Sequence, residues 1–237
     1  MSKILLLGAS GYIGQAFTTE LAQRSCEAIL LSRAQVNYCD FNTLRGYIRD
    51  ELGGIDFLIN VAGYTGQSSI DQCEIEKDAT LRGNLLLPQM LSHLAAAEDF
   101  LWLQVGTGCL YQGDNGGSGY NEEDPPNFCF SSPPCNFYCG VKALAEQVLC
   151  SDPRCYIARL RIPFDEFDDP RNFLTKLLTY EKIYVNVNTI SHRGEFVSTC
   201  LDLFERDAPR GIYNITNPGA MNTREIVSMM EKILQPD

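Results

Sequence analysis

The sequence predicts an α/β protein built on a doubly wound parallel sheet. Short apolar segments alternate with amphipathic segments along almost the whole chain, and the first apolar segment runs into a glycine-rich turn. The length of 237 residues suits one such core with a small C-terminal lobe. We expect a first domain over residues 1–162. Over residues 163–237 we expect a lobe too short for its own core, packed against the domain as one wall of a cleft.

Seven segments have the short apolar character of buried strands. They are residues 3–7, 28–31, 55–60, 101–106, 155–161, 183–185 and 212–215. Seven others repeat apolar side chains at the helical period. They are residues 11–25, 43–52, 79–97, 138–150, 172–180, 194–206 and 223–234. The regular alternation of the two types indicates parallel strands with helices on both faces of the sheet.

A glycine-rich turn joins the first predicted strand to the first predicted helix. Gly8 permits the tight turn, Gly11 lets a pyrophosphate approach the positive end of the helix, and Gly14 allows close packing on the strand. We therefore expect a dinucleotide site, whose contacts in this turn come from Gly8, Ser10, Gly11, Tyr12, Ile13 and Gly14. The alternative is a turn of the same shape that holds no ligand.

The end of the second predicted strand indicates which dinucleotide binds. NAD enzymes usually carry an Asp or Glu there for the ribose 2′-hydroxyl. This chain has no acid in Leu31-Ser32-Arg33, and a guanidinium pairs well with a 2′-phosphate. The sequence therefore favours NADPH, unless Arg33 is simply solvated.

Two loops follow predicted strand ends, where ligands bind in sheets of this kind. The loop at residues 62–67 offers Ala62 and Gly63 to the cofactor and Thr65 and Gln67 to a substrate. The loop at residues 112–136 is rich in Gly, Pro and Asn and leads directly into Tyr138. A loop of this length in a compact domain is usually functional or disordered, and we favour a function.

Tyr138 and Lys142 are four residues apart in a predicted helix, so they share one face. An ammonium group lowers the pKa of a neighbouring phenol, which makes Tyr138 a usable general acid or base. The position after the fourth strand of a nucleotide-binding fold favours catalysis, with both residues also contacting the cofactor. The alternative is an exposed Tyr/Lys pair.

Thr107 follows the fourth predicted strand in Val105-Gly106-Thr107-Gly108-Cys109. With the glycine-rich turn and the Tyr/Lys pair, this pattern resembles the extended short-chain dehydrogenase/reductases, which use NAD(P) on a carbonyl or hydroxyl carbon. The resemblance implies a Rossmann-type domain, and implies that Thr107 hydrogen-bonds the substrate oxygen that Tyr138 protonates. Alternatively, the hydroxyl caps its own turn.

Composition and charge exclude other classes of protein. A net charge of −11 argues against nucleic acid or an anionic membrane as a partner. No apolar run approaches a membrane span, and the first ten residues lack the layout of a signal peptide. Ten cysteines and two histidines include no C-x-x-C, so we expect reduced thiols and no metal site. We therefore expect a cytoplasmic protein with a small-molecule substrate, and leave a homodimer open.

Further segments, in one order along nearly the whole chain, sharpen the resemblance. They are residues 60–66, 106–109, 117–119, 122–128, 137–138, 169–176 and 211–219. Together they resemble the plant and viral nucleotide-rhamnose synthases, which are UDP-4-keto-6-deoxyglucose 3,5-epimerase/4-reductases. The bacterial dTDP-4-dehydrorhamnose reductases and GDP-fucose synthases are more distant relatives.

This resemblance implies two reactions in one pocket, on a 4-keto-6-deoxyhexose linked to UDP or dTDP. It maps the epimerase cysteine of the family onto Cys109 and the proposed partner lysine onto Lys176, and it places Asp40 near the adenine. A buried small residue and an exposed helical lysine are the alternatives for Cys109 and Lys176. In a 4-keto sugar the protons on C3 and C5 are acidic, and donors that stabilise the resulting oxyanion also assist reduction at C4.

Substrate recognition rests on fewer residues. Arg161, Arg171 and Asn172 are expected to face the diphosphate or the base of a nucleotide sugar. The chain departs from the family by an insertion at residues 129–135, just ahead of Tyr138. Two other functions stay open: a reductase or epimerase without the dual activity, and a non-catalytic dinucleotide-binding subunit.

Overall fold

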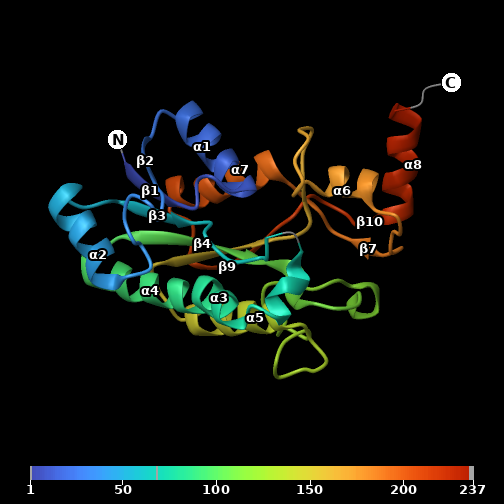
Figure 1. Ribbon diagram of the computed structural model, residues 1–237, viewed down its shortest axis with the longest axis horizontal. Coiled ribbons are helices and arrows are strands. Elements are labelled where there is room, and N and C mark those ends of the chain that lie inside the picture. The colour runs from blue at the N-terminus through green and yellow to red at the C-terminus, as the bar shows by residue number, and fades with distance from the viewer. Residues whose placement is uncertain (1, 68, 235–237) are drawn as a thin grey trace.

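A six-stranded parallel sheet forms the centre of the molecule (Figure 1). The computed structural model describes residues 2–67 and 69–234. The strands lie in the order β2-β1-β3-β4-β5-β9, and every neighbouring pair is parallel. Their bounds are β1 (Lys3–Leu7), β2 (Glu27–Leu31), β3 (Phe57–Asn60), β4 (Leu101–Thr107), β5 (Cys155–Leu160) and β9 (Gly211–Ile215). The predicted fold class is confirmed.

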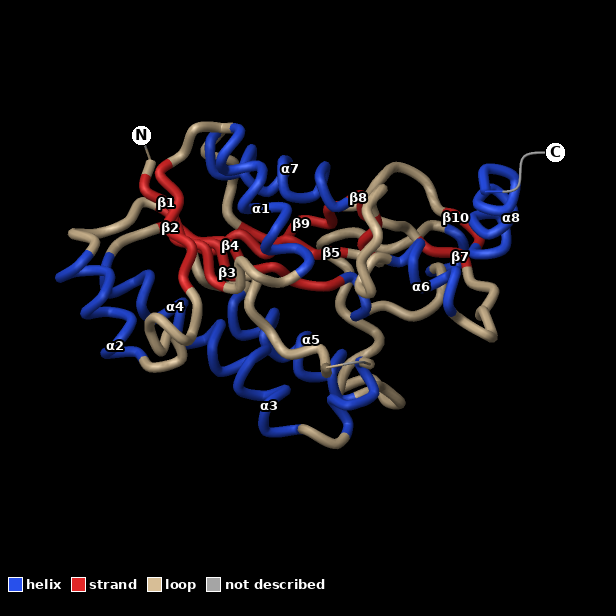
Figure 2. Tube along the Cα trace, turned by 45° about the horizontal axis from the view of Figure 1, so that its top comes forward, coloured by secondary structure: helices blue, strands red, loops and turns tan. Residues whose placement is uncertain are grey.

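Helices cover both faces of the sheet (Figure 2). One face packs on α1 (Tyr12–Gln23) and α7 (Arg193–Glu205). The other packs on α2 (Phe41–Gly46), α4 (Leu87–Glu98) and α5 (Phe137–Leu149), with α3 (Lys77–Leu81) beside them. Alternate side chains of β1 enter the two cores, Ile4 and Leu6 toward α1 and α7, and Leu5 and Leu7 toward α2 and α4. This two-sided burial explains why β1 is apolar at every position after Lys3.

The strand order reverses beside β1, because β2 lies on one side of it and β3 on the other. In open α/β sheets a crevice forms at such a point, outside the carboxyl ends of the strands. The glycine-rich turn after β1 and the loop after β3 both begin there. The topology therefore brings two of the predicted cofactor segments together.

Two predicted helices contain π-helical turns. Residues 43–52 form α2 and a π-helical turn at Tyr47–Glu51, and residues 79–97 form most of α3, a π-helical turn at Arg82–Leu86 and α4. A π turn holds one extra residue, and it often marks a functional position. In the second case it contains Asn84, whose side chain is buried at the site described below.

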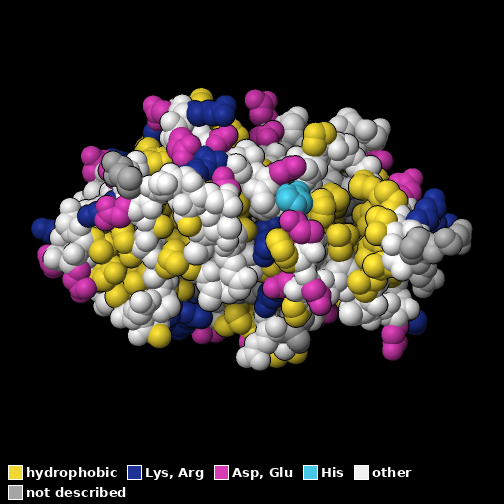
Figure 3. Space-filling view, turned by 90° about the horizontal axis from the view of Figure 1, so that it is seen from above, with side chains coloured by type: hydrophobic (Ala, Val, Ile, Leu, Met, Phe, Trp, Pro, Cys, Tyr) yellow, Lys and Arg dark blue, Asp and Glu magenta, His cyan; other side chains and the backbone are white. Residues whose placement is uncertain are grey.

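The segments 163–192 and 216–234 lie beside the sheet and form only two-residue ladders. β6 (Pro163–Phe164) pairs with β8 (Ser191–His192), and β7 (Val187–Asn188) pairs with β10 (Met221–Asn222). Helices α6 (Phe173–Thr179) and α8 (Thr223–Leu234) complete this region, where apolar side chains gather at the surface (Figure 3). Its exposed large side chains include Leu178, Tyr180, Tyr184, Val185, Val187, Met229, Ile233 and Leu234.

Two sequence predictions differ from this arrangement. The strand expected at residues 183–185 is wrong, since its apolar residues find no neighbouring strand and the ladder forms at Val187–Asn188 instead. The division expected at residue 162 also does not follow the packing, because α7 and β9 complete the main body. Strand β9 extends the sheet at β5, which a linear division of the chain does not reveal.

Neither a membrane-crossing helix nor a metal cluster is found in the part of the chain that the structure describes. No helix there is long and apolar enough to cross a membrane. Across the same residues, no group of three or more His, Cys, Asp or Glu side chains is placed to hold a metal ion.

Candidate active site

The glycine-rich turn has the shape that a pyrophosphate requires. Gly8 has a φ of 87°, and a Cβ there would lie 2.7 Å from the backbone nitrogen of Ala62. A Cβ on Gly14 would lie 2.1 Å from the carbonyl oxygen of Gly8, so both positions exclude side chains. Helix α1 begins at Tyr12; its N-cap, exposed Gly11, provides no side-chain cap, and its first turn contains no acid. Its first N–H groups and positive end therefore suit a phosphate anion.

Arg33 lies in the exposed turn after β2, as expected for a 2′-phosphate contact. Burial raises the pKa of the nearby Tyr38, and the guanidinium of Arg33 partly offsets this rise. Asp40 has a local task, because its carboxylate caps α2 by accepting a hydrogen bond from the Thr43 nitrogen at 2.8 Å. Hydrogen bonds from the side chain of Thr43 and then from its backbone nitrogen hold the pKa of Asp40 below its usual value.

The loop after β3 is held by the buried side-chain amide of Asn84, which the sequence prediction missed. Asn84 is 2% exposed, and its side chain accepts a hydrogen bond from the nitrogen of Tyr64 and donates one to its oxygen. A Cβ on Gly63 would lie 2.8 Å from this amide oxygen, so Gly63 lets the loop approach closely. A polar residue directly before the apolar run Leu85-Leu86-Leu87 was the available signal.

A second buried amide pair links the ends of β3 and β4. Asn60 donates to the side-chain oxygen of Gln104 at 2.8 Å and accepts from the nitrogen of Ala62 at 3.1 Å. Gln104 in turn donates to the carbonyl oxygen of Val105 at 2.8 Å. These satisfied polar groups hold the ends of both strands in one geometry.

Thr107 and Cys109 lie together where β4 ends. The hydroxyl of Thr107 accepts a hydrogen bond from the Cys109 nitrogen at 3.1 Å, which caps the short helix Gly108–Leu110. The turn-capping contact considered from the sequence is therefore present. Thr107 is also close enough to Tyr138 to oppose the rise in its pKa, so the two hydroxyls are neighbours.

Tyr138 begins the buried face of α5, which is capped by Asn136 through the Cys139 nitrogen at 2.7 Å. Its ring packs in a small cluster with Cys73 and Cys139, to which Cys109 is also packed. Burial, and next to it the neighbouring Cys109, raises the pKa of Tyr138. This direction is opposite to the lowering we expected, because the phenol is desolvated here.

Lys142 lies one turn further along the same helix face. Its Nζ donates a hydrogen bond to the carbonyl oxygen of Val105 at 3.0 Å. Burial lowers the pKa of Lys142 to about 8, while Glu146 opposes this change. The ammonium group is therefore held against the end of β4, where the Val105 oxygen also accepts the hydrogen bond from Gln104.

Arg161 contacts the thiol of Cys109, a contact that the sequence did not predict. One guanidinium nitrogen lies 3.0 Å from Sγ, and the other donates to the side-chain oxygen of Asn188. Gly108 makes room for this arginine, because a Cβ there would lie 3.2 Å from the Cδ atom of Arg161. Ile162, the next residue, has a φ of 42°, which is strained for a β-branched side chain and typical of functional sites. Arg161 was expected on a diphosphate or base, and its guanidinium instead faces the thiol.

Helix α6 and the two residues before it carry three of the predicted residues. Arg171 reaches the loop after β3, where it donates to Thr65 Oγ1 and, at 3.2 Å and 3.4 Å, to the carbonyl oxygens of Gly66 and Gln67. Lys176 is half-buried, and burial together with nearby Arg171 lowers its pKa. Asn172 was expected to contact a substrate, but its side chain has a different role.

Asn172 holds the chain instead of facing a ligand. It is 2% exposed, and its amide nitrogen lies within hydrogen-bond distance of three protein oxygens. Its side-chain oxygen caps α6 at the Leu174 nitrogen at 3.0 Å. Both ends of the amide are therefore used inside the protein.

The inserted segment at residues 129–135 folds against the start of α5. The ring of Phe130 occupies the space where a Cβ on Gly140 would lie, at 2.3 Å, and it contacts the ring of Phe137 at 5.7 Å between centroids. The Cys129 thiol contacts the Ser131 hydroxyl at 3.1 Å. The insertion thus covers the helix turn that carries Tyr138. A cavity of about 480 Å³ lies between this segment and the opposite face of α5, and Tyr138 does not line it.

Comparison with known proteins identifies the family to which the chain is similar. The family model described as RmlD substrate binding domain matches residues 2–226. A trifunctional UDP-glucose 4,6-dehydratase/UDP-4-keto-6-deoxy-D-glucose 3,5-epimerase/UDP-4-keto-L-rhamnose-reductase of Arabidopsis thaliana is 33% identical over 186 residues, 76% of this chain. A bifunctional dTDP-4-dehydrorhamnose 3,5-epimerase/dTDP-4-dehydrorhamnose reductase of the same plant is 32% identical over 185 residues, also 76% of this chain. The chain spans 27% of the length of the first plant protein and 60% of the second.

The fold also matches solved structures. The crystal structure of the L780 UDP-rhamnose synthase from Acanthamoeba polyphaga mimivirus superimposes with a TM-score of 0.87 at 26% identity. The match covers all of this chain and 82% of that one. The whole of the described architecture, including the segments beside the sheet, therefore has a counterpart in a solved protein.

Proposed function

Because this chain belongs to the RmlD substrate binding domain family, we propose that it is an NADPH-dependent 3,5-epimerase/4-reductase. Its substrate would be a 4-keto-6-deoxyhexose linked to UDP or dTDP, and its product a rhamnose-type sugar nucleotide. The observation that carries the proposal is the meeting of two hydroxyls and one thiol, from Tyr138, Thr107 and Cys109, where β4 ends. An acid for the ketone oxygen and a proton-transfer group for the ring carbons would then share one pocket.

The cofactor assignment rests on the residues that would hold it. The uncapped start of α1 suits the pyrophosphate, and exposed Arg33 suits a 2′-phosphate. When bound, NADPH supplies the hydride for C4 of the sugar. The chain's own task in reduction is to deliver a proton to the C4 oxygen.

Tyr138 is suited to that proton transfer. Burial raises its pKa, so the phenol stays protonated at neutral pH and can donate. Thr107 would donate a second hydrogen bond to the same oxygen. Lys142, fixed on the oxygen of Val105, would orient the cofactor beside Tyr138 and favour the phenolate after the proton has left.

Epimerisation needs an acid and a base on opposite faces of the sugar ring. In our proposal Cys109 removes the proton from C3 or C5, and the electron pair moves to the C4 oxygen, where Tyr138 and Thr107 stabilise the enolate. The ammonium of Lys176 then returns a proton to the same carbon from the other face. Arg161, 3.0 Å from Sγ, would orient Cys109 for this step.

A reductase without epimerase activity is the second candidate. The same Arg161 contact favours it, because a thiol used as an acceptor for a structural arginine needs no catalytic role. We further propose a cytoplasmic setting, which fits the ten free cysteines, since such thiols persist in reducing compartments.

The proposal is tested by adding NADPH and either UDP- or dTDP-4-keto-6-deoxyglucose to the purified chain. We expect NADPH oxidation and a rhamnose-type product with at least one of the two sugars, and slower turnover with NADH. Product identity is read by NMR. No oxidation with either sugar would contradict the proposed function.

A further inference from the structure

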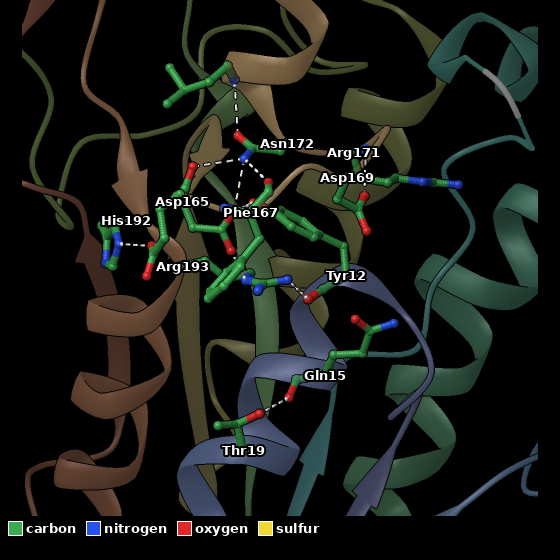
Figure 4. Close-up of polar contacts among 12 residues, drawn as sticks. Tyr12, Gln15, Thr19, Asp165, Phe167, Asp169, Arg171, Asn172, His192 and Arg193 are labelled. Atoms are coloured by element: carbon green, nitrogen blue, oxygen red, sulfur yellow. Dashed lines mark hydrogen bonds and ion pairs between the residues drawn. The ribbon is translucent and has the colours of Figure 1, made fainter. Parts of the chain in front are cut away.

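Tyr12 lies in the glycine-rich turn, yet its side chain is held by residues from the other end of the chain (Figure 4). Its hydroxyl donates to Asp165 Oδ1 at 2.9 Å, and its ring lies 4.3 Å beneath the guanidinium of Arg193. Arg193 also donates to the backbone oxygen of Tyr12 at 3.0 Å. Asp165 and Arg193, which follow Tyr12 by 153 and 181 positions, therefore hold the first residue of α1 in place.

Asp165 is the centre of these contacts. It follows β6 and is 4% exposed. Oδ1 accepts hydrogen bonds from Tyr12, from the Asn172 amide at 2.8 Å and from the Phe167 nitrogen at 3.3 Å. Oδ2 forms an ion pair with Arg193 Nε at 2.6 Å and accepts no hydrogen bond from the described residues. A buried carboxylate with one cation depends on each of its contacts, because no water replaces them.

The network continues from Asp165 into the substrate half of the cleft. Asn172 joins Asp165 to the backbone oxygen of Phe167 at 2.7 Å and caps α6. Helix α6 carries Lys176, and Arg171 at its start reaches the loop after β3. Movement of Asp165 would therefore move the residues proposed to act on the sugar.

The side chain of Tyr12 is engaged within the protein, by Asp165 and Arg193. Burial and the Asp165 hydrogen bond raise its pKa, so it remains a neutral donor at working pH. The backbone of Tyr12 lies at the start of α1, where the sequence predicts the pyrophosphate. Its side chain points toward Asp165 and Phe167 (Figure 4).

We propose that Tyr12 is a positioning residue for the nucleotide sugar, acting through Asp165 and Arg193 to fix residues 165–179 above the first turn of α1. The proposal rests on the proposed function for the identity of that ligand. Tyr12 belongs to the cofactor-binding turn, but in this proposal its side chain affects the residues that contact the sugar.

The test compares Tyr12→Phe with Tyr156→Phe. Each change removes one hydroxyl, and the Tyr156 hydroxyl donates to the oxygen of Ala208 at 3.0 Å, away from the site. For Tyr12→Phe we expect the KM for the 4-keto sugar nucleotide to rise about tenfold, since the lost hydrogen bond was made to a charged group. The Kd of NADPH, from tryptophan fluorescence or calorimetry, should change less than about twofold because backbone contacts remain.

Hydrogen exchange supplies a readout that needs no substrate. Amides in residues 165–179 should exchange faster in Tyr12→Phe and keep the parent rate in Tyr156→Phe, while α1 beyond its first turn is unchanged in both. Asp165→Asn should give the same pattern, more strongly, because Arg193 loses its partner.

The outcomes separate the two proposals. Weaker NADPH binding with an unchanged KM and unchanged exchange in residues 165–179 would overturn the role of Tyr12. Equal effects of Tyr12→Phe and Tyr156→Phe on KM and on exchange would show that the Tyr12 hydroxyl contributes only to general stability. That result would also overturn the proposed positioning role. If the parent chain does not turn over the sugar, the proposed function fails, while the exchange comparison still decides whether Tyr12 orders residues 165–179.

Discussion

The sheet-centred body and the segments beside it, residues 163–192 and 216–234, are held together by different interactions. In the body, strands of four to seven residues pair along their lengths and bury apolar side chains on both faces. In the segments beside it, the ladders are two residues long, and Asp165, Asn172 and Arg193 make the main connections. This difference indicates that Tyr138, the proposed proton donor, is positioned by the apolar packing of the body. The sugar-facing residues depend on a few individual polar contacts.

The largest expected effect is a loss of stability in the sheet-centred body. Glu146 and Arg159 form a buried pair with Oε1–Nη2 at 2.6 Å and Oε2–Nε at 2.8 Å, and their side chains are 8% and 1% exposed. Glu146→Gln leaves the buried arginine charge without its anionic partner, so the free energy of unfolding should fall by about 3–5 kcal/mol. Urea denaturation measures this change.

The control lies in the other region. Glu166→Gln removes a contact to His192 at 3.5 Å whose carboxylate is 67% exposed, and it should change the free energy of unfolding by about 1 kcal/mol or less. Equal losses in the two variants would show that the two regions do not differ as described.

The next effect is on chemistry in the body. Tyr138→Phe keeps the ring and removes the proton donor, so ketone reduction should fall about 10²-fold or more. The Kd of NADPH and the melting temperature should stay close to those of the parent. Steady-state turnover of the 4-keto sugar nucleotide checks this, with Tyr156→Phe as the matched tyrosine variant. Near-normal turnover in Tyr138→Phe would make Tyr138 a structural residue.

A smaller effect concerns the edge of the body, where β2 ends. Arg33→Ala should weaken NADPH about tenfold or more, because a charge-assisted contact to the 2′-phosphate is lost, and should leave NADH binding unchanged. Isothermal titration with both dinucleotides measures the gap. A parent protein that binds NADPH and NADH equally would rule out this role for Arg33.

The smallest effect is a pH dependence of stability. Burial lowers the pKa of Lys142 from 10.5 to about 8 in the folded protein. Between these two pH values the unfolded chain binds more protons, so the folded state gains stability as pH rises. Relative to Lys142→Met, the parent should gain at most about 1.4 kcal/mol per pH unit in this window. Urea denaturation of both proteins at pH 8 and at pH 10 checks the sign, and a difference that shrinks or reverses as pH rises would contradict it.

The body was predictable because its signals are local. Strand β1, the glycine turn and helix α1 each follow from residues adjacent in the sequence, and Tyr138, Lys142 and Thr107 follow from their place in that order. The pairing of Tyr12 with Asp165 was not predictable, because it joins residues 153 positions apart. The contact of Arg161 with Cys109 likewise depends on a strained turn at Ile162 and on space left by Gly108, which no periodic pattern reports.

The pKa of Tyr138 shows a further limit. The sequence gives the spacing to Lys142, but the direction of the shift depends on burial among Cys73, Cys109 and Cys139. Burial is a property of the assembled fold, so helix spacing alone predicted the wrong direction.

Solvent-deuterium exchange in Cys109→Ser tests the central claim, that one pocket serves both epimerisation and reduction. The parent, given UDP-4-keto-6-deoxyglucose in deuterated water without NADPH, should incorporate deuterium at C3 and C5. Cys109→Ser should lose this exchange by about 10²-fold or more, because a serine hydroxyl is far less acidic than a thiol. It should still reduce a sugar that is already epimerised. Cys26→Ser, a similarly half-buried cysteine elsewhere, is the control and should keep both activities. Reduction by the parent without any deuterium incorporation would contradict the claim and leave a simple reductase.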